Sequence, residues 1–499
     1  MARSRRRRER PGVERAAART NARTSARTKA RTRAETAVSS RFLSTGGGAP
    51  QADLGEALTR SLAPDGGLYV PERLEPFSAS EIAALLEAPF VEGGARLLAR
   101  LGLAELEPRE LEDLVRGSID FPLPLRWLDE AGDPALGVLE LFHGPTLAFK
   151  DVGARFMARL MARLRVTGRL PGGDRQLTVL AATSGDTGSA VAHAFHGLDG
   201  FRVVVLFPQG QISPAQQRLF TTLGENVTSL AVEGSFDLCQ SLVKRAFADP
   251  RLRRRVRLAS ANSINVGRLL PQTLYYYELC RVLERRRRGA ELWVCTPSGN
   301  FGNLTAGLYA RRLGLPIARL VAATNRNDVV PEFLAGGAFS PRPSVSTPSN
   351  AMDVGDPSNF QRIQALYPSD GALRQDLVGA RFGDRETLTA MREVYERWGE
   401  ILDPHAAVGY LGLRRALGER TDATRRPVDG VFLATAHPAK FREVVERAVG
   451  TAPPLPPALA RCMELPERIV TLSRDGAAQP GGEDPRYEQL CAVLEQGAP

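Results

Sequence analysis

The chain has 499 residues, of which 43% are hydrophobic and 24% charged, an ordinary globular composition with enough material for about three domains or two large ones. No apolar run approaches the roughly 18–20 residues that a helix needs to cross a bilayer, which excludes an integral membrane protein. The formal net charge of +10 is concentrated in Met1–Arg41, which holds 14 of the 66 Lys and Arg residues but only 3 of the 56 acidic ones, so a basic surface spread over the whole fold is not supported.

Residues 1–41 form an Arg-rich segment in which the triplet Ala-Arg-Thr recurs every four residues from Ala18 to Thr32. The segment has too few apolar groups to bury, so we expect a disordered tail. Three interpretations stay open: an extension from an upstream start codon, an organellar transit peptide, or a segment that binds nucleic acid nonspecifically through phosphates. We expect a cytoplasmic protein, or an organellar one if residues 1–41 are a transit peptide.

The next part of the chain, residues 42–121, is expected to be mainly helical. From Gly137 to about Pro438, apolar strand-like runs alternate with helical stretches, a pattern that indicates an α/β fold with mostly parallel sheets. The strand candidates are Val138–Phe142, Leu177–Ala182, Arg202–Phe207, Leu292–Thr296, Leu320–Ala323 and Val431–Ala434. Ligands in such folds bind at the carboxyl ends of the strands. After Leu465 the chain becomes rich in Pro and Gly, and we expect residues 466–499 to be peripheral.

Lysine is rare in this chain. Only Lys29, Lys150, Lys244 and Lys440 are present, so almost every basic residue is Arg. Because a guanidinium cannot form a Schiff base and keeps its proton in proteins, a retained lysine is a candidate for a site that needs a primary amine. Lys150 follows a predicted strand and a Gly-Pro turn at the start of a helix, where apolar neighbours and the helix N-terminus would lower the pKa of the amine and make it nucleophilic. A surface lysine is the alternative interpretation.

Two loops between a predicted strand and a predicted helix could bind anions. The segment Ser298–Asn303 contains glycines beside a helix N-terminus, which favours a phosphate, and it matches neither the GxGxxG nor the GK[ST] pattern of dinucleotide and Walker-type sites. The segment Thr183–Ser189 offers backbone N–H groups and hydroxyls to a carboxylate. Either loop could instead be a helix-capping turn.

Three further segments carry polar groups near predicted strand ends. Ser260–Arg268 brings amides, a hydroxyl and an Arg together, which suits a second phosphate, although these residues could also cap a helix. Asp403–His405 opens a turn, and Thr435–Phe441 follows a strand and includes Lys440. The five cysteines are scattered without a CxxC pair, so neither a disulfide framework nor a structural zinc site is supported.

Taken together, these segments resemble the threonine synthases, pyridoxal-phosphate enzymes of the tryptophan-synthase-β or fold type II group. The motifs occur in the same order over about 400 residues: Phe42–Thr45, Ala63–Pro71, the Lys150 segment, Thr183–Gly188, Asn262–Arg268, Ser298–Asn303, Ala323–Asp328, Met352–Phe360, Asp403–His405 and Thr435–Phe441. Two positions depart from the family pattern. Gly46 stands where an Arg usually follows Ser-Thr, and Ser61 stands where Gly is common.

The resemblance implies roles for individual residues. Lys150 would be the catalytic lysine that forms the Schiff base with pyridoxal 5'-phosphate, and Thr435 would be the hydroxyl facing its pyridine nitrogen. The cofactor phosphate would be held by Gly299, Asn300, Phe301 and Asn303. The substrate carboxylate would be surrounded by Ser184, Asp186 and Thr187, and the substrate phosphate would be met by Asn265 and Arg268. No metal ion is implied.

The resemblance also implies a domain organisation and a reaction. Residues 122–150 and 292–465 would form a larger cofactor-binding α/β domain, residues 151–291 a smaller one, and residues 42–121 an N-terminal domain. The enzyme would convert O-phospho-L-homoserine and water into L-threonine and phosphate by γ-elimination and β-addition of water, as a monomer or homodimer without a specific nucleic-acid partner.

Two alternatives stay open. The first is another fold type II lyase, either similar to threonine dehydratase or acting on phosphothreonine. The second is a noncatalytic protein that binds nucleic acid through its basic tail.

Overall fold

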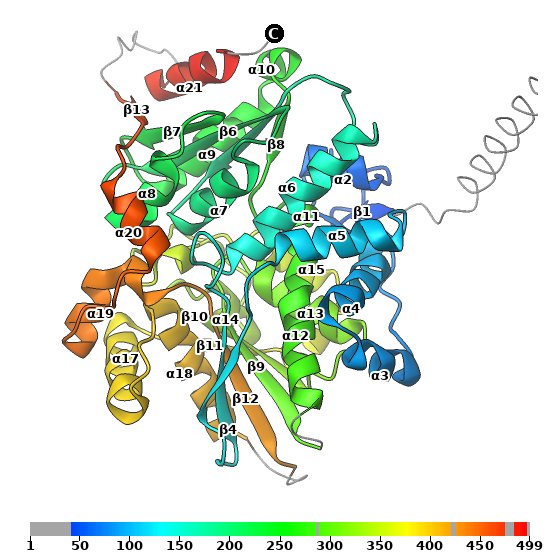
Figure 1. Cartoon of the computed structure of the whole chain (residues 1–499), viewed down its shortest axis with the longest axis vertical. Coiled ribbons are helices and arrows are strands. Elements are labelled where there is room, and N and C mark those ends of the chain that lie inside the picture. The colour runs from blue at the N-terminus through cyan, green and yellow to red at the C-terminus, as the bar shows by residue number, and fades with distance from the viewer. Residues whose placement is uncertain (1–40, 286–288, 421–425, 475–483, 497–499) are drawn as a thin grey trace, which may run out of the picture.

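The computed structural model describes residues 41–285, 289–420, 426–474 and 484–496. The expected disordered tail, apart from Arg41, therefore lies outside the described residues. Two separate β-sheets dominate the rest of the molecule, and Figure 1 shows one above the other, with helices of the N-terminal part beside them. None of the helices within the described ranges combines the length and the apolar character needed to span a bilayer.

The larger sheet has six strands in the order β11-β10-β9-β12-β4-β3. Their bounds are β3 (Leu125–Asp129), β4 (Ala135–Glu140), β9 (Glu291–Pro297), β10 (Arg319–Thr324), β11 (Val378–Arg381) and β12 (Val428–Ala434). All neighbours are parallel except β3, which pairs antiparallel with β4 at one edge. Every residue of β4 and of β12 is buried, as expected of strands in a parallel sheet that is covered on both faces.

The smaller sheet has five parallel strands in the order β13-β7-β6-β5-β8. Their bounds are β5 (Leu177–Ala182), β6 (Phe201–Pro208), β7 (Val227–Val232), β8 (Leu258–Ser260) and β13 (Ile469–Leu472). The edge strand β13 comes from the segment that we expected to be peripheral. Its pairing with β7 gives this segment a part in the sheet, which the Pro- and Gly-rich composition did not indicate.

Helices cover both sheets. Those of the N-terminal part are α2 (Leu54–Arg60), α3 (Ala79–Glu87), α4 (Phe90–Leu98) and α5 (Pro108–Ser118), beside the hairpin of β1 (Phe42–Ser44) and β2 (Tyr69–Pro71). Those along the smaller sheet and the central core are α6 (Lys150–Val166), α7 (Asp186–Phe195), α8 (Pro214–Thr221), α9 (Phe236–Ala248), α10 (Pro250–Arg255), α11 (Val266–Leu269), α12 (Thr273–Glu284) and α13 (Gly302–Arg312).

The remaining helices follow in the C-terminal part of the chain. They are α14 (Val329–Leu334), α15 (Phe360–Gln364), α16 (Asp370–Asp376), α17 (Asp384–Trp398), α18 (Pro404–Gly418), α19 (Arg442–Val449), α20 (Pro457–Glu464) and α21 (Pro485–Glu495). Short 3-10 turns are η2 (Leu270–Gln272), η3 (Asn350–Met352) and η4 (Pro438–Phe441), and a π-helical turn, η1, spans Ala99–Leu103.

The hydrophobic core explains why the two sheets stay together. One large cluster joins buried residues of α6, α12 and α13 to apolar side chains from both sheets and from the N-terminal helices. Separate clusters lie under α17 and α18 on the larger sheet and between α9 and α21 on the smaller one. The predicted α/β fold with mostly parallel sheets is confirmed.

Candidate active site

The carboxyl ends of strands from both sheets meet at one cavity. Residues after β4, β9 and β12 reach it from the larger sheet, and residues after β5 and β8 reach it from the smaller one. All the predicted site residues except Asn265 line this cavity: Lys150, Ser184, Asp186, Thr187, Arg268, Gly299, Asn300, Phe301, Asn303 and Thr435. Lys150 and Thr435, almost 300 residues apart in sequence, thus line one cavity. This agrees with the rule that ligands of such folds bind at the carboxyl ends of the strands.

Lys150 is the first residue of α6, and its side chain is only 15% exposed. The pKa of its amine is lowered from 10.5 to about 8, chiefly by burial; Asp186 opposes this shift, whereas Lys440 and Arg268 contribute to it. The amine lies over the ring of Phe149, 4.7 Å from its centroid. A substantial fraction of Lys150 is therefore neutral near physiological pH, the form that a nucleophilic amine requires.

The turn that carries Lys150 is held in place by hydrogen bonds. Thr146 donates through its backbone N and its Oγ1 to the buried carboxylate of Asp151, at 2.8 and 2.7 Å. The backbone N of Phe149 donates to the carbonyl of Thr435, 2.9 Å away. Because Thr435 directly follows β12, this bond fixes the start of α6 against the end of a neighbouring strand.

The turn between β9 and α13 places backbone N–H groups at a helix N-terminus, where they have no acceptor inside the helix. A Cβ at Gly299 would lie 2.6 Å from Met352 Cα, so only glycine fits there. Phe301 has a φ of 61°, in the left-handed region. Asn303 donates to the carbonyl of Pro297 at 2.8 Å and accepts from Ser298 Oγ at 2.7 Å, so its side chain braces the turn.

The loop between β5 and α7 is rigid for similar reasons. Thr183 Oγ1 accepts hydrogen bonds from the backbone N of Gly185 and of Gly188, at 2.9 and 2.7 Å. Ser184 and Thr187 lie partly exposed at the cavity. Asp186 is buried, and Gln216 Nε2 donates to its Oδ1 at 2.9 Å. A carboxylate repels another carboxylate, so Asp186 is not a direct ligand for that group of a substrate, and Ser184 and Thr187 are better suited.

Arg268 and Asn265 differ in their access to the cavity. Arg268 is buried and lines it, and its guanidinium donates to the carbonyl of Ala261. Asn265, expected at the substrate phosphate, lies outside the cavity. It caps α11 by accepting from the backbone N of Gly267, and its amide nitrogen donates to Leu58 O at 2.7 Å and to Ser61 Oγ at 3.0 Å. Its side chain is thus engaged within the protein, at the N-terminus of the helix that carries Arg268.

Ser61, which stands where Gly is common in the family, takes part in the same hydrogen-bond network as Asn265. Its φ is 65°, a conformation that favours glycine, yet its hydroxyl donates to Ser260 O at 3.2 Å and accepts from Ser260 N at 3.0 Å. The hydroxyl therefore connects the end of α2 to β8, which offsets the backbone strain.

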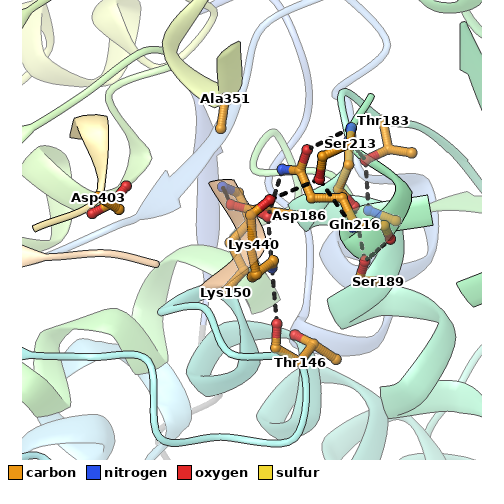
Figure 2. Close-up of polar contacts among 12 residues, drawn as sticks. Thr146, Lys150, Thr183, Asp186, Ser189, Ser213, Gln216, Ala351, Asp403 and Lys440 are labelled. Carbon is orange, nitrogen blue, oxygen red and sulfur yellow. Dashed lines mark hydrogen bonds and ion pairs between the residues drawn. The ribbon is translucent and has the colours of Figure 1, made fainter. Parts of the chain in front are cut away.

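Four residues with contacts in or beside the cavity carried no assigned role in the sequence analysis. Lys440 is fully buried and forms an ion pair with Asp186, and Gln216 binds the same carboxylate. His405 Nδ1 contacts Asp403 Oδ2 at 2.5 Å, and its Nε2 accepts from the backbone N of Ala351 at 3.2 Å. The rarity of lysine and the Asp-Pro-His turn drew attention to three of the four, but Gln216 had no signal. Figure 2 shows the Lys150 and Lys440 side chains converging on Asp186.

The residues present fit pyridoxal phosphate. The turn at Gly299 lies at a helix N-terminus that can receive a phosphate, and Lys150 offers an amine with a lowered pKa in the same cavity. Asn262 Oδ1 and Asn300 Oδ1 are buried at this cavity without a hydrogen-bond partner, so they leave acceptors for an occupant that carries hydrogen-bond donors.

Family models match nearly all of the described chain. The model described as threonine synthase N terminus matches residues 41–119, the pyridoxal-phosphate dependent enzyme model matches residues 120–426, and the model described as threonine synthase, C-terminal, matches residues 406–479.

Individual relatives agree with these matches. The threonine synthase of Escherichia coli (strain K12) is 45% identical over 430 residues, which cover 86% of this chain and 95% of the relative. That of Serratia marcescens is 46% identical over 422 residues, which cover 85% and 94%. The crystal structure of threonine synthase from Escherichia coli aligns with a TM-score of 0.81 at 42% identity, over 91% of this chain and 99% of that one. The PLP-bound threonine synthase from Brucella melitensis aligns with a TM-score of 0.79 at 34% identity, over 92% and 99%.

Proposed function

The chain belongs to the threonine synthase family of pyridoxal-phosphate-dependent enzymes, and from this premise we propose that it converts O-phospho-L-homoserine and water into L-threonine and phosphate. The observation that carries the proposal is the position of the Lys150 amine, which lies in the same cavity as the glycine-containing turn at the start of α13. A nucleophilic amine and a phosphate site in one cavity are the two features that an aldehyde-bearing phosphorylated cofactor needs.

The cofactor would be held at both ends by this chain. Lys150 would bind it covalently, and the backbone around Gly299 and Asn300, braced by Asn303, would hold its phosphate. Thr435 lines the cavity and would offer a neutral hydroxyl, rather than a carboxylate, to the ring nitrogen, which would then not be held protonated. When bound, pyridoxal phosphate supplies an electron sink for carbanions next to the substrate amine.

The substrate would be oriented by separate groups for its two anionic ends. Ser184, Thr187 and the N-terminus of α7 would hold the carboxylate, and Arg268 would hold the phosphate that leaves from Cγ. The buried guanidinium keeps its charge and has a donor, Nε, without a partner. Two fixed ends keep elimination and water addition on one face of the substrate.

Lys150 would move the protons of the reaction. With the substrate bound, Nζ would accept protons from Cα and Cβ as phosphate leaves Cγ, and would return protons to Cγ and Cα as water adds at Cβ. The low pKa of this amine suits both tasks, because general acid–base catalysis is most efficient when the pKa lies near the working pH.

Product identification tests the proposal. Incubation of the purified chain with O-phospho-L-homoserine should release equal amounts of phosphate and threonine. A keto acid in place of threonine would indicate a dehydratase-like enzyme, and turnover of phosphothreonine alone would indicate a phosphothreonine lyase. Lys150→Ala should lose the visible cofactor absorption and turnover, while Lys244→Met, a change at an exposed lysine on α9, should keep both.

We also infer finer properties that the function implies. The enzyme acts on a small molecule, needs no specific nucleic acid, and works in the cytoplasm as a monomer or homodimer. Residues 122–150 and 292–465 would carry the cofactor, and residues 151–291 would supply most substrate contacts. Size-exclusion chromatography with light scattering measures the oligomeric state directly.

A further inference from the structure

Lys440 is fully buried, yet the reaction outlined above gives it no task. It lies in η4, after β12 of the larger sheet. Its Nζ lies 2.6 Å from Asp186 Oδ1 and donates to the carbonyl of Thr146 at 2.9 Å. Burying an ammonium group is costly, so an energetic or functional reason for this contact is required.

Asp186 has two ammonium groups beside it, one at each carboxylate oxygen. Oδ1 contacts Lys440 and accepts from Gln216, whereas Oδ2 lies 3.9 Å from Lys150 Nζ. Burial alone would raise the pKa of the Asp186 carboxyl, but the ammonium groups of Lys440 and Lys150 hold it well below its usual range. Asp186 is therefore a permanent carboxylate next to the amine that must become neutral.

A buried carboxylate needs a counter-ion, and this requirement conflicts with the chemistry of Lys150. If Lys150 were the sole cation beside Asp186, the ion pair would keep it protonated and unable to attack an aldehyde or accept a proton. Lys440 balances the carboxylate whether Lys150 is charged or neutral.

We propose that Lys440 is a positioning residue, the permanent counter-ion of Asp186, whose contact with Oδ1 leaves Lys150 free to act as a neutral amine. The inference rests on the proposed function, because it takes Lys150 to be the amine that carries the cofactor. Lys440 itself lies behind the cavity wall and acts through Asp186.

Other charged groups face the same region. Arg268 and Asp403 act on Lys150, His405 acts on Asp186, and Asp151 lies near Lys440. They remain unchanged in every variant below, so differences among the variants report on the Lys440–Asp186 pair.

The test is a pH titration of the visible absorption band of the full-chain holoenzyme in five forms: wild type, Lys440→Met, Asp186→Asn, the double variant and the control Lys244→Met. In the holoenzyme the visible band reports protonation of the Schiff-base nitrogen that Lys150 provides. Loss of Lys440 leaves an uncompensated carboxylate next to that nitrogen, so the midpoint of Lys440→Met should move to higher pH by about one unit or more. Asp186→Asn should move the midpoint to lower pH. The double variant should lie between the two single variants, and Lys244→Met should match the wild type.

A purely structural role for Lys440 would lower the thermal stability of Lys440→Met without moving the midpoint, and that result would overturn the proposal. If Lys440→Met does not fold, Asp186→Asn carries the test, because an unchanged midpoint in that variant is equally contrary. Failure of the proposed function looks different: the wild type itself would show no cofactor band or form no threonine.

Discussion

At the scale of single residues, the titration of Lys150 is the property most directly open to measurement. Only the neutral amine attacks an aldehyde, and burial lowers the pKa of this amine to about 8. The rate at which the cofactor-free chain captures pyridoxal phosphate should rise with pH, with a midpoint near pH 8, and level off about one unit above it. Stopped-flow absorbance at a series of pH values measures this dependence. A midpoint near 10.5, the value of an exposed lysine, would contradict the burial argument.

Gly299 allows a second prediction at this scale. In Gly299→Ala, the new Cβ would lie 2.6 Å from Met352 Cα, a backbone atom that cannot move aside cheaply. The turn at the start of α13 would shift, and affinity for the cofactor should fall about tenfold or more, equivalent to at least about 1.4 kcal/mol. Gly371→Ala on the exposed surface of α16 is the matched control and should bind normally, as measured by fluorescence titration of pyridoxal phosphate.

Single residues also show what the sequence could not settle. An Asn just before a helix fits both a ligand and a helix cap, and in the structure the side chain of Asn265 caps α11. Asp186 follows a predicted strand and lines the cavity, but its charge partner could not be foreseen. Lys440 lies 254 positions further along the chain, and no local pattern connects the two.

At the scale of elements, helix α13 carries both the phosphate turn and an interior glycine. Ala is normally the better helix former by about 1 kcal/mol, so Gly307→Ala would be expected to stabilise an isolated helix. Here, however, the Cβ would lie 2.7 Å from the buried ring of Tyr276 on α12. Gly307→Ala should therefore destabilise the chain by about 1–3 kcal/mol.

The matched control for this change is Gly418→Ala. Gly418 is exposed at the end of α18, and nothing lies within 4 Å of its new Cβ. This variant should be as stable as the wild type or slightly more stable. Denaturant unfolding of both variants measures the difference, and equal stabilities would show that α12 and α13 pack more loosely than the structure indicates.

The elements differ in how well the sequence predicted them. β5 was predicted with its observed bounds, because a run that is apolar except for Thr178 marks a strand buried on both faces. β8 was not predicted, because three residues are too few to establish a period, and β11 was not predicted because only one of its four residues is buried. β13 was hidden by the Pro- and Gly-rich composition around it.

At the scale of the whole molecule, the C-terminal helix α21 completes the smaller sheet's outer layer. Leu490 and Leu494 are fully buried against α9, and Arg202 donates to the carbonyls of Val493 and Leu494. Deleting residues 484–499 should expose this cluster and lower Tm by about 5 °C or more. Turnover at 25 °C should stay near that of the full chain, because α21 does not line the cavity. A Tm unchanged by calorimetry would mean that α21 contributes little.

Residues from both sheets line the cavity, so a spectroscopic signal from the cavity can report on how the two sheets are arranged. Asp186 comes from the strand end of one sheet and Lys440 from the strand end of the other, so their contact spans the seam between the two halves. Any rocking of one half against the other stretches that contact and changes the electric field at position 150. The absorption maximum of the bound chromophore would then report the separation of the two halves, and it can be measured in solution without a crystal.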